Sequence, residues 1–155
     1  MRSVDIFNAV SGTVVICFAL YLIGLAFLIV INPSAAERFL RSFASSASAH
    51  YTEQGLRLLV GVSTVNFSGF MWCSDAFRIF GWTIIVSTVG LLLVPWRWHH
   101  KFATKVMPSL YHRMKLFAFG AFALGALILF GASYALTQKP NQSTTAQHAM
   151  RVANR

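Results

Sequence analysis

Long apolar stretches alternate along the chain with short segments that hold the charged residues. No Asp, Glu, Lys or Arg occurs between Asp5 and Glu37, Arg57 and Asp75, Arg78 and Arg97, or Lys115 and Lys139. A helix needs about 20 residues, each rising 1.5 Å, to cross a hydrocarbon core about 30 Å thick. The pattern therefore predicts an all-α integral membrane four-helix bundle, with spans at about 12–32, 55–73, 79–96 and 116–136.

The second of these spans is the least apolar. It has to include Gly55, and the charged end of Arg57 has to reach the membrane interface. Three spans is therefore the alternative to four. Pro33 and Pro95 are expected to end or bend the first and third spans, because proline lacks the backbone N–H that a helix needs. The transmembrane domain is expected over 1–137, followed by a polar, flexible tail over 138–155.

Composition supports the membrane interpretation. Hydrophobic residues make up 56% of the chain and charged residues 11%, whereas soluble domains carry about 25% charged residues. The net charge of +9 would suggest nucleic acid as the partner of a soluble domain. In a membrane protein, basic residues collect in cytoplasmic loops beside anionic headgroups. We therefore expect a bilayer with anionic headgroups as a partner, and no nucleic acid.

The basic residues also predict an orientation. With four spans, eight Lys and Arg fall on one side of the membrane and five on the other. The eight are Arg38, Arg41, Arg57, Arg97, Lys101, Lys105, Arg113 and Lys115; the five are Arg2, Arg78, Lys139, Arg151 and Arg155. Because cytoplasmic loops carry the excess of Lys and Arg, both long loops are expected inside. The prediction is a bacterial cytoplasmic (inner) membrane protein with both termini outside.

Both long loops carry an interfacial pattern. In the first, apolar residues recur at helical spacing over 36–51, which predicts one short amphipathic helix along the cytoplasmic headgroups. In the second, aromatic and basic residues form an interfacial belt expected to anchor the third span: Trp96, Arg97, Trp98, Lys101 and Lys105. A basic-aromatic pair follows the proline in both loops: Arg38-Phe39 after Pro33, and Lys101-Phe102 after Pro95. A further hypothesis is therefore that the two halves of the chain are parallel helix-loop-helix repeats.

Small residues at helical spacing predict where the spans touch, because close backbone approach drives helix association in lipid. The last span carries Ala118, Ala121, Gly125, Ala132 and Ala135 on one face. The third carries Thr83, Ser87 and Gly90, and the first carries Gly12, Ala19 and Ala26. A compact bundle would use these faces internally. The alternative, which we favour for the face on the last span, is that it docks against another subunit.

Few residues suggest chemistry. Asn66 is the only strongly polar side chain deep in a predicted span, and we expect Thr83 or Ser87 to hydrogen-bond it. Haem would require His side chains pointing into the bundle, but the histidines fall in the loops and the tail. His99, His100 and Arg97 are weak candidates to bind a cofactor at the membrane interface. No metal-ligand spacing or catalytic motif occurs, so no metal, cofactor or enzymatic activity is predicted.

These observations favour a non-catalytic accessory or structural subunit of a larger membrane complex, with other membrane subunits or further copies of itself as partners. Small-residue and aromatic surfaces suit protein and lipid contact. One alternative is a small transporter or channel that forms only as a homo-oligomer. A second alternative is a haem- or quinone-binding redox protein that uses the residues at the cytoplasmic interface.

Overall fold

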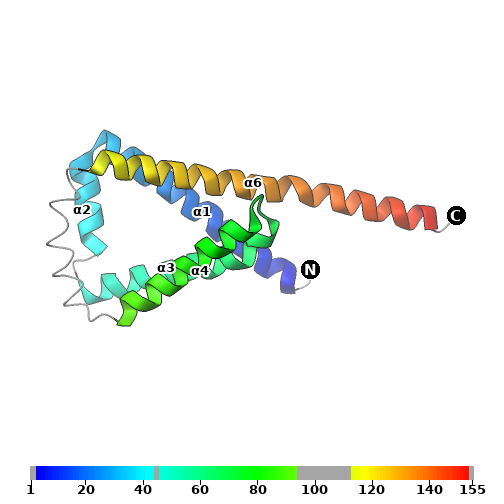
Figure 1. Cartoon of the computed structure of the whole chain (residues 1–155), viewed down its shortest axis with the longest axis horizontal. Helices are drawn as coiled ribbons and strands as arrows, with labels where there is room; N and C mark the ends of the chain where they lie inside the picture. Colours follow the sequence, from blue (N-terminus) through cyan, green and yellow to red (C-terminus); the bar gives the residue numbers. More distant parts are fainter. Residues whose placement is uncertain (1–2, 44–45, 94–112, 154–155) are drawn as a thin grey trace.

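The computed structural model describes residues 3–43, 46–93 and 113–153, and every element in these segments is a helix (Figure 1). The elements are α1 (Ser3–Ile31), α2 (Pro33–Phe43), α3 (Ala47–Phe67), the 3₁₀ helix η1 (Ser68–Phe70), α4 (Ser74–Leu93) and α6 (Met114–Ala153). The all-α prediction is thus confirmed for the described part of the chain.

The helices form two pairs. Helix α6 packs along α1, and α4 packs along α3. The pairs meet near η1, which joins α3 to α4, and they diverge toward α2 (Figure 1). We call these two regions the η1 end and the α2 end of the molecule.

Three described helices are long and apolar enough to cross a membrane: Val4–Ile31, Ser74–Leu93 and Met114–Ala135. The remaining predicted span lies in α3 and is not among them. The first half of α3 is polar and includes Glu53 and Arg57, which lowers its hydropathy. Membrane crossing by α3 therefore stays a prediction.

The first span ends where the sequence predicted. Helix α1 ends at Ile31 and α2 begins at Pro33. Between them, the Oδ1 atom of Asn32 accepts hydrogen bonds from the Ala35 backbone N–H at 3.0 Å and from the Ser34 hydroxyl at 2.8 Å. An Asn that caps a helix, followed by proline in the first turn, starts a new helix efficiently. The chain therefore changes direction at this point.

The single interfacial helix predicted over 36–51 is wrong. Helix α2 ends at Phe43, and α3 begins at Ala47. Ser46 separates them because its backbone is extended and its hydroxyl accepts a hydrogen bond from the Ala49 N–H at 3.1 Å. Ser at this position satisfies a backbone donor of the first turn and so fixes the start of α3. Tyr51 consequently belongs to α3 rather than to the interfacial helix.

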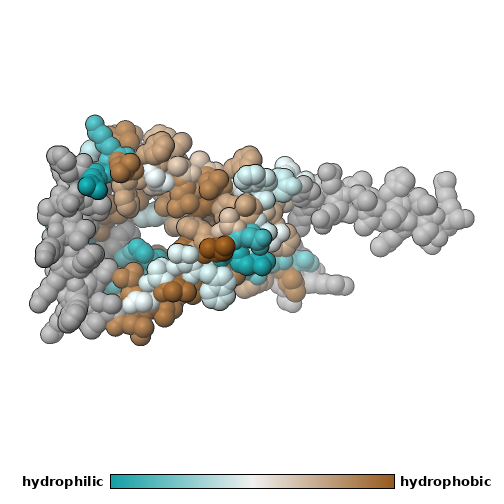
Figure 2. Space-filling model, in the orientation of Figure 1, coloured by the Kyte–Doolittle hydropathy of each residue, from teal (hydrophilic) through white to brown (hydrophobic). Residues whose placement is uncertain are grey.

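Two apolar clusters hold the helices together. The cluster at the η1 end joins α1, α3, α4 and α6 through Val15, Ala19, Phe67, Met71, Phe77, Ile128, Ala132 and Ala135. The cluster near α2 joins α1, α2 and α6 through Leu25, Ala26, Ile29, Ala36, Met114, Ala118 and Ala121. Large apolar side chains are nevertheless exposed on α1, α4 and α6, and apolar residues cover much of the surface in Figure 2. An apolar exterior is what a lipid-facing surface requires.

Helix α6 continues beyond its apolar part to Ala153. It projects past the rest of the molecule (Figure 1). The sequence predicted a flexible tail from residue 138, whereas the backbone of this segment is helical up to Ala153. The loop needed to compare the two predicted repeats, around Lys101, lies outside the described residues, so the repeat stays a hypothesis.

Candidate functional site

Helix α3 has an inverted distribution of polar and apolar residues. Its buried positions are His50, Gln54, Gly61, Ser63, Thr64 and Phe67. Leu56, Leu59 and Val62, in contrast, are about half exposed, at 54%, 50% and 48%. A helix in water buries its apolar face, whereas a helix in lipid gains by turning its polar groups inward. We take the polar residues near the start of α3 as the candidate functional site.

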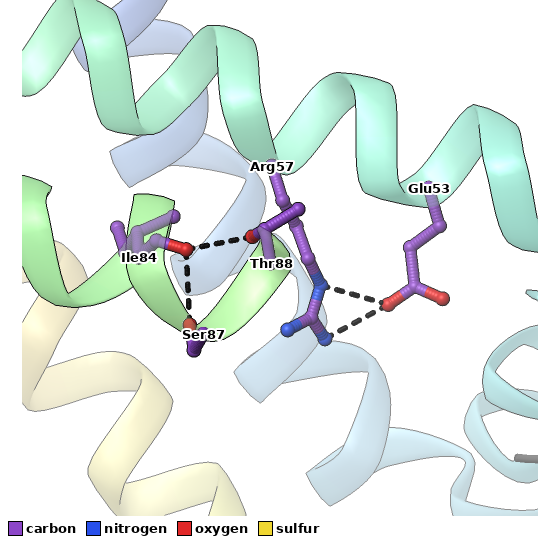
Figure 3. A network of polar contacts seen from close by, with 5 residues as sticks. All are labelled: Glu53, Arg57, Ile84, Ser87 and Thr88. Atoms are coloured by element: carbon purple, nitrogen blue, oxygen red, sulfur yellow. Dashed lines mark hydrogen bonds and ion pairs between the residues drawn. The ribbon is translucent and has the colours of Figure 1, made fainter. Parts of the chain in front are cut away.

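An ion pair lies on this part of α3. Both Nε and Nη2 of Arg57 contact Oε1 of Glu53, at 3.0 Å and 2.8 Å (Figure 3). The two side chains project from the same side of the helix, one turn apart. The Arg57 side chain is 47% exposed and that of Glu53 22%. Ion pairs at this spacing stabilise a helix only modestly in water, but pairing matters more where water is scarce.

Tyr21, on α1, is a residue of another helix that interacts with this ion pair. It lies near enough to Glu53 and Arg57 to interact with both charges. Its ring also contacts the ring of Phe39 in α2, with centroids 6.4 Å apart. Tyr21 and Phe39 are both partly exposed, at 42% and 39%. Tyr21 therefore lies between the ion pair of α3, with which it interacts, and Phe39 of α2, which its ring contacts.

Gln54 and His50 are buried beside this charged site, each with 1% of its surface exposed. The His50 ring contacts that of Tyr51, with centroids 5.5 Å apart. In the described part of the chain, neither Oε1 nor Nε2 of Gln54 has a hydrogen-bond partner. A buried polar group without a partner costs about 1–3 kcal/mol. Gln54 is therefore unfavourably placed in the conformation that the structure shows.

The middle of α3 is closed against α4. A Cβ atom on Gly61 would stand 2.8 Å from a side-chain carbon of Ile85, and one on Gly81 would stand 2.9 Å from the Val65 backbone nitrogen. Thr64 and Thr88 are buried, and their hydroxyls donate to carbonyls of their own helices at 2.8 and 2.7 Å. The polar groups at the α2 end are thus separated from those at the η1 end by close packing.

Asn66 belongs to a separate polar group at the η1 end. Its Nδ2 atom donates to Ser11 Oγ at 3.0 Å and to Asn8 Oδ1 at 3.2 Å, both on α1. The expected partners, Thr83 and Ser87, are wrong. Their hydroxyls donate to the carbonyls of Ile79 and Ile84 within α4 and are exposed. Asn66 therefore links α3 to α1 rather than to α4.

The small face of α6, defined by Ala118, Ala121, Gly125 and Ala132, is buried. A Cβ atom on Gly125 would stand 2.8 Å from the Ala19 carbonyl oxygen and 2.8 Å from a side-chain carbon of Ile23. The face on which an intermolecular contact was expected therefore lies against α1 of the same chain. The internal role expected for the small residues of α1 is confirmed, because Gly12, Ala19 and Ala26 are buried as well.

The small face of α4, defined by Thr83, Ser87 and Gly90, has the opposite environment. The sequence favoured an internal position for it, but these residues are exposed, and a Cβ on Gly90 would meet nothing within 4 Å. Helix α4 instead turns Phe77, Gly81 and Thr88 inward. Among the small faces identified from the sequence, this one is left uncovered by the described residues.

The candidate cofactor and anchor residues all fall between α4 and α6 in the sequence. Arg97, His99 and His100 lie outside the described residues, as do Trp96, Trp98, Lys101 and Lys105. Within the described segments, no group of three or more His, Cys, Asp or Glu side chains is placed to hold a metal ion. Cys17 and Cys73 are exposed and not joined to each other.

Sequence reasoning missed the site at the start of α3. The relevant signal was the spacing of His50, Gln54 and Arg57 at positions i, i+4 and i+7, which puts them on one helix face. Placing the second span at 55–73 divided this group, because it left His50 and Gln54 in a loop and only Arg57 in the span. A comparison with family models, curated proteins and solved structures finds no match to this chain.

Proposed function

We propose that the chain is a four-span protein of a bacterial cytoplasmic membrane that acts as a non-catalytic accessory or structural subunit of a larger membrane complex. The observation that carries this proposal is the uncovered small face of α4. Thr83, Ser87 and Gly90 are exposed on a helix long and apolar enough to span a membrane. Such a face permits another helix to approach closely.

The packing within the chain supports this use of small residues. Gly12, Gly61, Gly81, Gly125 and Gly131 each lie where a Cβ would come within 2.8 Å or less of another helix. Small positions in this molecule thus mark many of the places where helices touch. The small face of α4 likewise includes a glycine, Gly90, and Ile79 and Val86 lie beside this face, each 67% exposed. A partner helix seated there would gain both close approach and apolar contact.

The inverted polarity of α3 supports four spans rather than three. Its exposed residues include Leu56, Leu59 and Val62, which favour lipid, whereas His50 and Gln54 are buried. If α3 crosses the membrane beside α4, the basic loops place both termini outside.

Native co-purification tests the accessory role. A tagged wild-type protein, extracted in mild detergent, should bring down a defined membrane partner. Gly90→Leu should release that partner while leaving the thermal stability unchanged, because a side chain at this position meets nothing within the chain. Gly24→Leu is a matched control, since Gly24 also lies in a membrane helix with free space around it. A Gly90→Leu variant that retains every partner would contradict the proposal.

A further inference from the structure

Tyr21 lies level with the middle of a helix that is long and apolar enough to span a membrane. Within the α6 stretch Met114–Ala135, Gly125 is eleven residues after the first residue and ten before the last. A Cβ atom on Gly125 would stand 2.8 Å from the Ala19 carbonyl oxygen and 3.2 Å from Leu22 Cβ. These two residues of α1 lie on either side of Tyr21 in the sequence. Tyr21 is therefore at about the same depth as the centre of the α6 span.

The Glu53–Arg57 ion pair also lies within the length of the spans. Both of its charges act on the Tyr21 side chain. The packing of α3 against the antiparallel α4 gives an independent estimate of the depth. A Cβ atom on Gly61 would stand 3.2 Å from a side-chain carbon of Ile84. Arg57, one turn earlier in α3, is therefore level with Thr88, and Figure 3 shows the two side chains beside each other. Thr88 is five residues before the last residue of α4.

The protein leaves these polar groups partly uncovered. The side chain of Arg57 is 47% exposed and that of Glu53 22%, and Tyr21 is 42% exposed. Ionisable groups inside a membrane pair with one another and face the protein interior or a water-filled cavity, because exposure to hydrocarbon is costly. Only Nε and Nη2 of Arg57 contact Glu53. Since a guanidinium group carries five N–H donors, others remain that need water as an acceptor.

We propose that water enters the membrane from the α2 end, in a recess between the two helix pairs that reaches Tyr21, Glu53 and Arg57. The pairs diverge toward this end (Figure 1). At the η1 end, in contrast, the Phe67 ring lies 2.8 Å from where a Cβ on Gly12 would stand, so the pairs are in close contact there. The recess gives ions and small polar solutes access to a charged site inside the membrane. This inference rests on the four spans of the proposed function, but not on the accessory role.

Cysteine labelling tests the recess. In a Cys17→Ser, Cys73→Ser background, Tyr21→Cys and Leu20→Cys are treated with a membrane-impermeant maleimide in inverted vesicles, whose cytoplasmic face points outward. Leu20 is the matched control, because it is 55% exposed at the same depth and on another side of α1. Tyr21→Cys should react at least about tenfold faster than Leu20→Cys, because a thiol in apolar surroundings does not ionise to the reactive thiolate.

The outcomes of this labelling separate the recess from the spans. Slow reaction at both positions would overturn the recess and leave α1 in the membrane. Fast reaction at both positions would show that α1 does not lie in lipid, and it would overturn the four spans together with the recess.

A second measurement leaves the site unaltered. Hydroxyl radicals generated from water are applied to the wild-type protein in lipid nanodiscs, and each oxidation rate is divided by the rate in the unfolded chain. Tyr21 should be oxidised at least about threefold faster than Phe122 on this scale, because the hydrocarbon core contains no water outside the recess. Phe122 is the control, since it is 45% exposed near the middle of the α6 span. Equal normalised rates would contradict the recess.

Discussion

Gly125 of α6 lies against the backbone of Ala19 in α1, with room for a hydrogen atom but not for a side chain. A Cβ atom at position 125 would stand 2.8 Å from the Ala19 carbonyl oxygen. Ala19 itself is fully buried, at 0% exposure. This contact holds the α1–α6 pair together between the two apolar clusters.

The first prediction concerns this contact. Gly125→Leu should lower the free energy of unfolding by about 1–3 kcal/mol or more, because the two helices must separate to admit the side chain. Thermal unfolding in detergent measures the effect. Gly120→Leu, on the same helix, should change little, since a Cβ there meets nothing within 4 Å. Equal stability of the two variants would mean that α1 and α6 do not pack as described.

The second prediction concerns Asn66. Asn66→Ala should destabilise the protein by about 0.6 kcal/mol for each interhelical bond lost. A double-mutant cycle with Ser11→Ala should give a coupling energy of similar size, because Ser11 Oγ accepts one of these bonds. The same cycle with Thr83→Val should give no coupling, since the Thr83 hydroxyl donates within its own helix. If Asn66 instead showed coupling only to Thr83, the hydrogen-bond partner expected from the sequence would be correct and the partner in the structure wrong.

The third prediction concerns the start of α3. Ser46→Ala should cost about 1 kcal/mol, because it removes the hydroxyl that accepts a hydrogen bond from the Ala49 N–H. Amide exchange in the first turn of α3 should also become faster. Ser48→Ala, two residues further along, serves as the control. If Ser46→Ala left both stability and exchange unchanged, the cap would have no role in separating α2 from α3.

How far the sequence predicted this fold depended on the strength of each local signal. The apolar segments within α1, α4 and α6 are long and free of charge, so their helices were identified without ambiguity. Asn32-Pro33 likewise predicted a helix end from local chemistry alone. The helical spacing over 36–51 was misleading because it continues across the break at Ser46.

The small face available to a partner was harder to predict, because it depends on which helix faces meet within the chain. Small residues occur on the small faces of both α4 and α6, and composition alone does not distinguish them. The face of α6 lies against α1, while that of α4 is exposed. For Asn66, the sequence similarly offers hydroxyl groups as hydrogen-bond partners on both neighbouring helices, α1 and α4. Only the packing of the hairpin assigns it to Asn8 and Ser11.

The fourth prediction concerns the topology. Alkaline phosphatase fused after Leu136 should be active outside the cytoplasm, whereas a fusion after Lys105 should be inactive, because the basic loop stays inside. A fusion after Phe70 tests the crossing by α3 and should also be active. The opposite pattern at Leu136 and Lys105 would reverse the orientation. If the Phe70 fusion is inactive, α3 does not cross the membrane and lies on its cytoplasmic side.

The most direct test of the accessory role is photocrosslinking from the small face of α4 in native membranes. A photoreactive amino acid at Ser87 should form an adduct with one defined membrane protein, because this exposed position faces away from the chain's own helices. The same probe at Phe119, which is 72% exposed on α6, should react with lipid and give no protein adduct. An adduct from Ser87 with a distinct protein is the result that the account predicts. Adducts only with a second copy of the chain, or none at all, would contradict it.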